Sequence, residues 1–448
     1  MPDTFVLRSS RVITPHGERP AAVIIRGGLI ADVVDPDHIP VSCRIEDVGS
    51  RVVMPGLVDT HVHINEPGRA DWEGFETATQ AAAAGGITTL VDMPLNSSPV
   101  TVTVAALKQK IAAAQGKLFV DCGFHGGLVP GHERDVEALL DAGVIGIKAF
   151  LVHSGIDEFP AAGEKELAAV MPVLARRGIP LLVHAEIDRE KPDLPAGGPD
   201  NYRRYLASRP NSWENDAVKM MIHLCREYEC PVHIVHLSSA EALEDILKAR
   251  IDGLRLTVET CPHYLYFRAE EIPDGETRFK CTPPIRDGEN NSQLWDALHA
   301  GFIDMICTNH SPCPPEMRKL DEGDLTKAWG GIASLQLSLS IAWTAARQAG
   351  ALIEDVARWV SSAPARLAGL DKRKGAIAKG YDADLVVFEP DATFKVETGN
   401  LYHRHKITPY EGRTLYGVVE RTYLRGRKIG EGGIALAGAG GQVLRRPS

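Results

Sequence analysis

The sequence predicts an α/β protein in which a (β/α)8 barrel of the TIM type is accompanied by a small β-sandwich built from both chain ends. Three observations indicate this fold. Between residues 54 and 372, short apolar runs alternate with segments of helical period. Residues 1–53 and 373–448 instead carry short strand patterns separated by glycine and proline, and several of the central runs end in a histidine or a lysine. Buried strands that alternate with helices are typical of a parallel sheet covered by helices on both faces.

Residues 1–53 are the predicted first part of the small β domain. Strand-like runs at 5–8, 22–25 and 29–33 are separated by turn signals, among them Arg26-Gly27-Gly28. A segment of this length cannot bury a sufficient core alone. We therefore expect its strands to pair with strands from another part of the chain.

Eight apolar runs are the predicted barrel strands, and residues 54–372 are the predicted barrel domain. The runs lie at 57–63, 87–92, 118–122, 144–148, 179–184, 231–236, 254–259 and 303–308. Segments of helical period lie between them at 101–115, 132–142, 163–177, 212–229 and 239–251. An open, doubly wound sheet is the alternative. Its site would lie in a single crevice, whereas potential metal ligands end several of these runs, which favours the barrel.

Residues 373–448 are predicted to complete the small β domain. Strand patterns return at 383–388 and 417–426. The last dozen residues are rich in glycine and alanine and end in Arg445-Arg446-Pro447-Ser448, a composition that predicts a mobile tail.

Composition and charge exclude several classes of function. The net charge is −10 and no Lys/Arg cluster is present, which argues against a nucleic-acid surface. No apolar run approaches the roughly 20 residues that span a membrane, and Met1–Phe5 lack the features of a signal peptide. The eight cysteines include no C-x-x-C pair, so we expect reduced thiols in the cytoplasm rather than disulfides or a structural zinc site.

The segment His61-Val62-His63 begins the candidate metal site. Alternate residues of a strand point to the same face, so the two imidazoles can share a metal ion. A chance pair of histidines is the alternative. Barrel sites lie at the C-terminal ends of the strands, and further potential ligands end later runs, namely Lys148, His184, His236 and Asn309-His310. Their expected convergence in one barrel mouth favours a metal site, whereas His233 lies on the opposite strand face and is expected to be structural.

Lys148 requires a chemical explanation, because a protonated ammonium group would repel a metal ion. Burial and nearby cations lower the pKa of a lysine, and a neutral amine can react with CO2 to form a carbamate. Four neutral imidazoles bring no charge to offset two divalent ions, whereas a bridging carbamate does. We therefore predict two divalent metal ions per chain and a carboxylated Lys148 between them.

Beyond these residues, seven longer motifs and a few C-terminal residues resemble the cyclic amidohydrolases of the amidohydrolase superfamily, and within that group the allantoinase branch. The similarity covers the predicted barrel and much of the β domain. The motifs are His63-Ile64-Asn65-Glu66-Pro67-Gly68-Arg69, Trp72-Glu73-Gly74-Phe75-Glu76, Met93-Pro94-Leu95-Asn96, Glu259-Thr260-Cys261-Pro262-His263-Tyr264, Pro283-Pro284-Ile285-Arg286-Asp287, Asn309-His310-Ser311-Pro312-Cys313-Pro314-Pro315-Glu316-Met317, Ala328-Trp329-Gly330-Gly331-Ile332-Ala333, then Tyr402, Arg404, His405, Lys406 and Pro409-Tyr410.

The resemblance implies both a ligand set and a reaction. His61 and His63 would hold one metal ion and His184 and His236 the other, with carboxylated Lys148 as the bridge; the metal would be zinc. A bridging hydroxide would attack a ring amide carbonyl. In an allantoinase this reaction, a step of purine and ureide catabolism, opens the hydantoin ring of allantoin to give allantoate. The resemblance also suggests a homotetramer.

One position departs from the family pattern. The family has an aspartate in an Asp-His-Ser-Pro run, where this chain has Asn309. That aspartate ligates a metal and carries the proton from the hydroxide to the leaving nitrogen. An amide cannot accept and return a proton near neutral pH. Three explanations stay open: an engineered inactive variant, a natural homologue that lost or rerouted the proton step, or a different base.

Substrate selectivity is expected to depend on neutral groups. Dihydroorotases hold the substrate carboxylate with an arginine two residues after the second histidine, where this chain has Asn65. A neutral amide can hydrogen-bond a neutral ureide; a role as a turn residue is the alternative for Asn65. The alternatives to an allantoinase are a hydantoinase or dihydropyrimidinase, or a non-catalytic scaffold. The other predicted substrate-binding residues are Asn96, Thr282, Trp329, Gly330 and Gly331.

Overall fold

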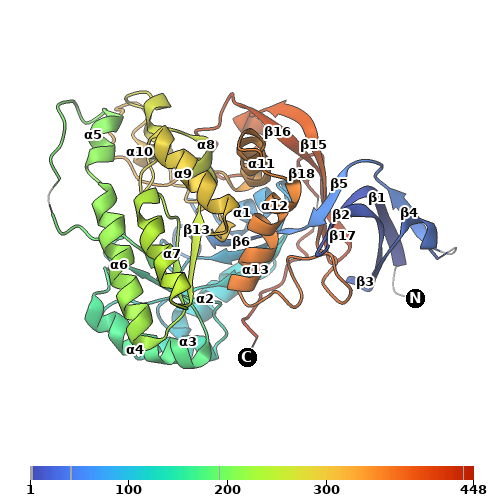
Figure 1. Ribbon diagram of the computed structural model, residues 1–448, viewed down its shortest axis with the longest axis horizontal. Coiled ribbons are helices and arrows are strands. Elements are labelled where there is room, and N and C mark those ends of the chain that lie inside the picture. The colour runs from blue at the N-terminus through green and yellow to red at the C-terminus, as the bar shows by residue number, and fades with distance from the viewer. Residues whose placement is uncertain (1–3, 41–42, 191, 437, 448) are drawn as a thin grey trace.

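The computed structural model describes residues 4–40, 43–190, 192–436 and 438–447. Figure 1 shows a barrel wrapped by helices, with the strands from the beginning of the chain beyond one of its sides. Strands from the end of the chain, β15 to β18, lie between these two parts in the figure and form one end of the strand order of the outer sheet.

The outer sheet contains nine strands and is built from both chain ends, as predicted. In spatial order it runs β18-β17-β16-β15-β5-β1-β2-β3, with β4 paired to β1. Strand β15 joins the two ends because Leu385–Phe388 pair antiparallel with Val52–Pro55 of β5. The strands are β1 (Thr4–Thr14), β2 (Gly17–Arg26), β3 (Leu29–Val34), β4 (Arg44–Asp47), β5 (Val52–Pro55), β15 (Leu385–Lys395), β16 (Thr414–Leu424), β17 (Arg427–Glu431) and β18 (Ile434–Ala435).

The barrel strands correspond to the eight predicted apolar runs, and all their pairings are parallel. The third barrel strand begins within the predicted run 118–122, extends beyond it and is divided by His125 into β8 and β9. A bridge between Val62 at the end of β6 and His310, which follows β14, connects the two ends of the barrel. The strands are β6 (Leu57–Val62), β7 (Ile87–Asp92), β8 (Asp121–Phe124), β9 (Gly126–Gly127), β10 (Ile147–Phe150), β11 (Leu181–His184), β12 (Val232–Ile234), β13 (Leu256–Thr260) and β14 (Met305–Ile306). The predicted barrel is therefore confirmed.

The five predicted helical segments are helices in the structure. They are α2 (Val104–Ala114), α3 (Asp135–Asp141), α4 (Glu164–Arg177), α6 (Asn211–Tyr228) and α7 (Leu243–Ile251). In α6, Ala217, Val218, Met221, Leu224 and Cys225 recur at helical spacing and are buried, so one apolar face packs onto the barrel. The other helices are α1 (Phe75–Ala84), α5 (Tyr202–Ala207), α8 (Pro262–Tyr266), α9 (Gly288–His299), α10 (Pro315–Arg318), α11 (Ser338–Gln348), α12 (Ile353–Ala357) and α13 (Ala363–Leu367).

The predicted mobile tail is wrong for residues 438–447, the part of the tail that the structure describes. The backbone N–H of Cys122 in β8 donates to Gln442, and that of Leu444 donates to Cys122, both at 2.9 Å. The Leu444 side chain is buried in an apolar cluster with Val91 and Ile145. The segment therefore adds an extended stretch beside β8, and its apolar Val443-Leu444 pair outweighs the flexible composition before it.

Two further expectations concern the state of the cysteine thiols and the presence of membrane-spanning helices. All eight cysteines are free, and all except Cys43 are buried. In the described part of the chain, no helix is both long and apolar enough to cross a bilayer.

Candidate active site

The C-terminal ends of five barrel strands bring the predicted ligands together. His61 and His63 lie at the end of β6, and His184 ends β11. His236 lies just after β12, and its ring centroid is 5.3 Å from that of His61 and 4.6 Å from that of His184. The rings of His61 and His63 are 5.6 Å apart. The four imidazoles thus surround one point at the barrel mouth.

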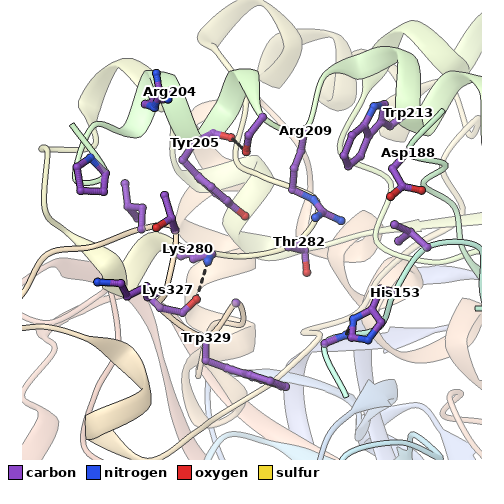
Figure 2. Close-up of a pocket in the computed structure, with 18 of the residues that line it drawn as sticks. His153, Asp188, Arg204, Tyr205, Arg209, Trp213, Lys280, Thr282, Lys327 and Trp329 are labelled. Carbon is purple, nitrogen blue, oxygen red and sulfur yellow. Dashed lines mark hydrogen bonds between the residues drawn. The ribbon is translucent and has the colours of Figure 1, made fainter. Parts of the chain in front are cut away.

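A small cavity of about 40 Å³ lies at this point, roughly the space for one or two water molecules. It opens beside a larger pocket of about 620 Å³, and Phe150, Ser154, His184, Thr282, Trp329 and Gly330 line both. Figure 2 shows the larger pocket, with Thr282 and Trp329 among its walls. The inner cavity can accommodate small ions or water, whereas an organic substrate would enter from the larger pocket.

Lys148 of β10 is fully buried near this cavity. Its Nζ has no hydrogen-bond partner among the described residues and lies 5.0 Å from the centroid of the Phe150 ring. Burial lowers the pKa of Lys148 to about 7, although the carboxylate of Glu259 opposes the shift. An ammonium group buried without a partner is costly, so a large fraction of this amine is neutral near neutral pH. This is the state that reacts with CO2.

The four imidazoles are held in their neutral form. Burial lowers the pKa of His184 to about 4 and also lowers the pKa of His61. Burial, reinforced by neighbouring histidines, holds the pKa values of His63 and His236 well below the usual value. Neutral imidazole is the form that binds a metal ion.

Carboxylates behind the imidazoles fix which ring nitrogen faces the cavity. Nδ1 of His61 bonds Oε1 of Glu259, whose other oxygen lies 3.1 Å from Nε2 of His233. Nε2 of His184 lies 2.6 Å from Oε2 of Glu186. For His61 and His184, the carboxylate accepts a hydrogen bond from the N–H of one ring nitrogen, and the other nitrogen keeps a lone pair for a metal ion. His233 is therefore part of the supporting layer, as its strand face predicted.

Asn96 supports His63 in a similar way. Its side-chain amide lies 3.3 Å from Nδ1 of His63, and its Oδ1 has no hydrogen-bond partner among the described residues. With the amide turned so that Oδ1 accepts from Nδ1–H of His63, Nε2 of His63 is left for a metal ion.

Asn309 also lines the inner cavity. It lies just after β14 with a φ of 46°, in the left-handed region that asparagine and aspartate tolerate better than other non-glycine residues. His310 holds the segment from behind, because its Nδ1 accepts from Ser334 N–H at 3.2 Å and its Nε2 lies 3.3 Å from a carboxylate oxygen of Glu73. The backbone would therefore accept aspartate at position 309.

The residues predicted to bind substrate divide into two groups. Asn65 does not line the cavity: its Nδ2 donates to the carbonyl of Pro312 at 3.3 Å, and its φ is 67°. These contacts favour the role of a turn residue. The residues that do line the cavity are Asn96, Thr282, Trp329, Gly330 and Gly331.

Three buried aspartates form a second group of potential ligands, away from this cavity. Asp121, Asp382 and Asp384 have oxygens close enough to share an ion. However, Nζ of Lys374 lies within 2.9 Å of all three, and Arg425 bonds Asp121. Arg373 also lies 2.8 Å from Asp382, so three cationic side chains balance the three aspartates and the group is a buried ion-pair network.

The chain belongs to the amidohydrolase family, whose sequence model matches residues 52–429. Proteins of this family generally bind metal ions. An allantoinase of Streptomyces avermitilis is 50% identical over 99% of both chains, and an allantoinase of Arabidopsis thaliana is 47% identical over 96% of this chain and 89% of its own. Among solved structures, an L-hydantoinase (dihydropyrimidinase) from Arthrobacter aurescens covers 100% of both chains with a TM-score of 0.92 and 30% identity. A dihydropyrimidinase from Brevibacillus agri covers 99% of both, with a TM-score of 0.88 and 26% identity.

Proposed function

We propose that this chain is a metal-dependent hydrolase of cyclic ureides that opens the hydantoin ring of allantoin to give allantoate. The observation that carries the metal-dependent reaction is the buried amine of Lys148, which has no hydrogen-bond partner among the described residues and lies near four neutral imidazoles. The identity of 50% to an allantoinase over nearly the whole chain supports the substrate.

The residues at the barrel mouth fit a pair of divalent ions. His61 and His63 would hold one ion and His184 and His236 the other, with carboxylated Lys148 between them. Four imidazoles and one anionic oxygen donor suit zinc, which we propose as the metal. When bound, the pair would polarise the ring carbonyl and lower the pKa of a water molecule.

The side chains around the cavity would then decide how easily the ring opens. Hydrolysis forms a bond from water oxygen to the carbonyl carbon and breaks the ring C–N bond, so the leaving nitrogen must gain a proton. Asn309 stands on the cavity wall where the related enzymes would carry aspartate. Its amide can hold water by a hydrogen bond, but it cannot take up and return the proton. We therefore propose that this chain is an impaired form of the enzyme.

The test is a ring-opening assay of the wild type and Asn309→Asp on allantoin, hydantoin and dihydroorotate. We expect allantoin to be the preferred substrate and the aspartate variant to be about 10²- to 10⁴-fold faster, because general acid–base catalysis contributes that much. Metal content measured in both proteins is the control, since the substitution should leave both ions in place.

Other outcomes would identify the alternatives. Equal rates for the two proteins would remove Asn309 from the proton step. A preference for hydantoin would favour the hydantoinase function of the structural neighbours. A chain that binds no metal and opens no ring in either form would be the non-catalytic scaffold.

The proposal also covers the cellular compartment, the oligomeric state and the domain division of the protein. The free, mostly buried thiols favour a reducing compartment, and we propose the cytoplasm. We also propose a homotetramer, which sedimentation analysis would test, and a division into a barrel of residues 54–372 and a β domain of residues 1–53 and 373–448.

A further inference from the structure

The larger pocket beside the inner cavity has an excess of positive charge. Arg204, Arg209, Lys280 and Lys327 line it, and Asp188 is the one acidic side chain among its described lining residues (Figure 2). The substrate proposed above is a neutral ring, so these charges are not explained by its binding.

Two of the cations are already paired. The guanidinium of Arg209 bonds both oxygens of Glu186, at 2.9 and 2.5 Å. Lys327 is largely exposed and lies 3.0 Å from Asp324. These side chains therefore contribute little net charge to the pocket.

Lys280 differs from both. It is only 9% exposed, its Nζ donates to the carbonyl of Ala328 at 2.5 Å, and it forms no ion pair with any described carboxylate. Behind it, the buried Arg318 donates to the carbonyl of Trp329 at 3.1 Å and likewise forms no ion pair within the described chain. Burial, with Arg209 and Arg318 nearby, lowers the pKa of Lys280 to about 8, so the group is still mainly cationic at neutral pH.

Lys280 and Arg318, two buried cations without carboxylate partners in the described part of the chain, create a positive potential on one wall of the pocket. Figure 2 shows Lys280 on this wall beside Tyr205, with Thr282 and Trp329 close to it. Thr282, two residues after Lys280, also lines the inner cavity. An anion formed in the inner cavity could therefore reach the Lys280 wall by a short path.

We propose that Lys280 forms a binding subsite for the carboxylate of an acyclic ureido acid, the product of ring opening. This inference rests on the proposed function. Hydrolysis turns a neutral ring amide into a carboxylate and a free ureido group. Only the product therefore carries the negative charge that could pair with the ammonium group of Lys280. Lys280 would thus select between substrate and product in binding.

The test measures binding of allantoate and of allantoin to the wild-type protein, Lys280→Met and Lys280→Gln by calorimetry. Glutamine keeps a donor for Ala328 without the charge, so it separates charge from packing. We expect the Kd of allantoate to rise roughly 10- to 100-fold in both variants, as for a lost hydrogen bond to a charged group. The Kd of allantoin should be unchanged, and Lys327→Met should alter neither.

The second measurement is the binding of dihydroorotate, a ring that itself carries a carboxylate, to the same variants. Weaker binding of dihydroorotate but not of allantoate would place an acidic substrate, rather than the product, at Lys280. Unchanged allantoate and dihydroorotate affinities in both Lys280 variants would overturn the subsite alone. A wild-type protein that binds neither allantoin nor allantoate would overturn the proposed function as well.

Discussion

At the scale of single residues, four histidines line a shared cavity, and three of them, His61, His63 and His184, are held from behind by a further side chain. Strand-end positions predicted His61, Lys148 and His184 because parallel strands end at one edge of a barrel. The supporting roles of Glu259 and Glu186 were not predicted. Which ring nitrogen a carboxylate engages depends on neighbouring strands, and no local spacing records it.

Two residues have contacts in the structure that the local sequence did not predict. Asn65 was expected to contact substrate, but its amide bonds the carbonyl of Pro312. Lys280 carried no motif, yet it is a buried cation without an acidic partner among the described residues. Pairing of a charge is a property of the folded chain, so a sequence pattern could not reveal it.

Replacing Lys148 by alanine should lower the metal content of the protein. Without an anion between them, two divalent ions beside four neutral imidazoles repel each other uncompensated. We expect about two ions per wild-type chain and at most one in Lys148→Ala, measured by elemental analysis. The exposed Lys108→Ala should keep the wild-type content. Full metal loading of Lys148→Ala would exclude the bridging role.

At the scale of elements, the predicted barrel strands were continuous apolar runs and the predicted helices were segments with a clear helical period. Strands β8 and β10 begin a few residues later than predicted, because the apolar runs at 118 and 144 already start in the preceding turns. Helix α11 was missed for a different reason. It is buried continuously from Ser338 to Ala346, and its buried residues include Ser338, Ser340 and Thr344, whose polar side chains do not mark a core face in the sequence.

The C-terminal segment beside β8 should contribute measurably to stability. Leu444→Ala removes a buried side chain from the cluster with Val91 and Ile145, and such truncations cost about 2–5 kcal/mol. We expect a lower thermal unfolding midpoint. The exposed neighbour Arg445→Ala is the matched control and should change stability by less than about 0.5 kcal/mol. Equal midpoints for both variants would show that the segment is not anchored by Leu444.

At the scale of the whole molecule, the network around Lys374 joins separate parts of the chain. Asp121 belongs to the barrel strand β8, Asp384 directly precedes β15, and Arg425 directly follows β16. Lys374 bonds both aspartates, and Arg425 bonds Asp121. The network therefore fastens the barrel to the sheet made by the chain ends.

Lys374→Met should loosen this connection. Removing one partner of a buried ion pair typically costs about 3–5 kcal/mol. The variant leaves Asp384 buried without a cationic partner among the described residues and weakens the charge compensation of Asp121 and Asp382. In the variant these carboxylates should bind protons more readily when folded than when unfolded, so its stability deficit should shrink as the pH falls from 8 to 5. Urea unfolding at both pH values measures this, with the exposed Lys379→Met as control. A deficit that is equal at both pH values would contradict the assignment.

The pairing of β5 with β15 also has a consequence for synthesis. Strand β5 leaves the ribosome early, while its neighbour β15 begins only at Leu385, after the whole barrel. Throughout that interval the nascent chain presents an open strand edge, the feature that promotes pairing between wrong molecules. Crowded polysomes, rather than the finished protein, are therefore where this molecule is most exposed to misassociation.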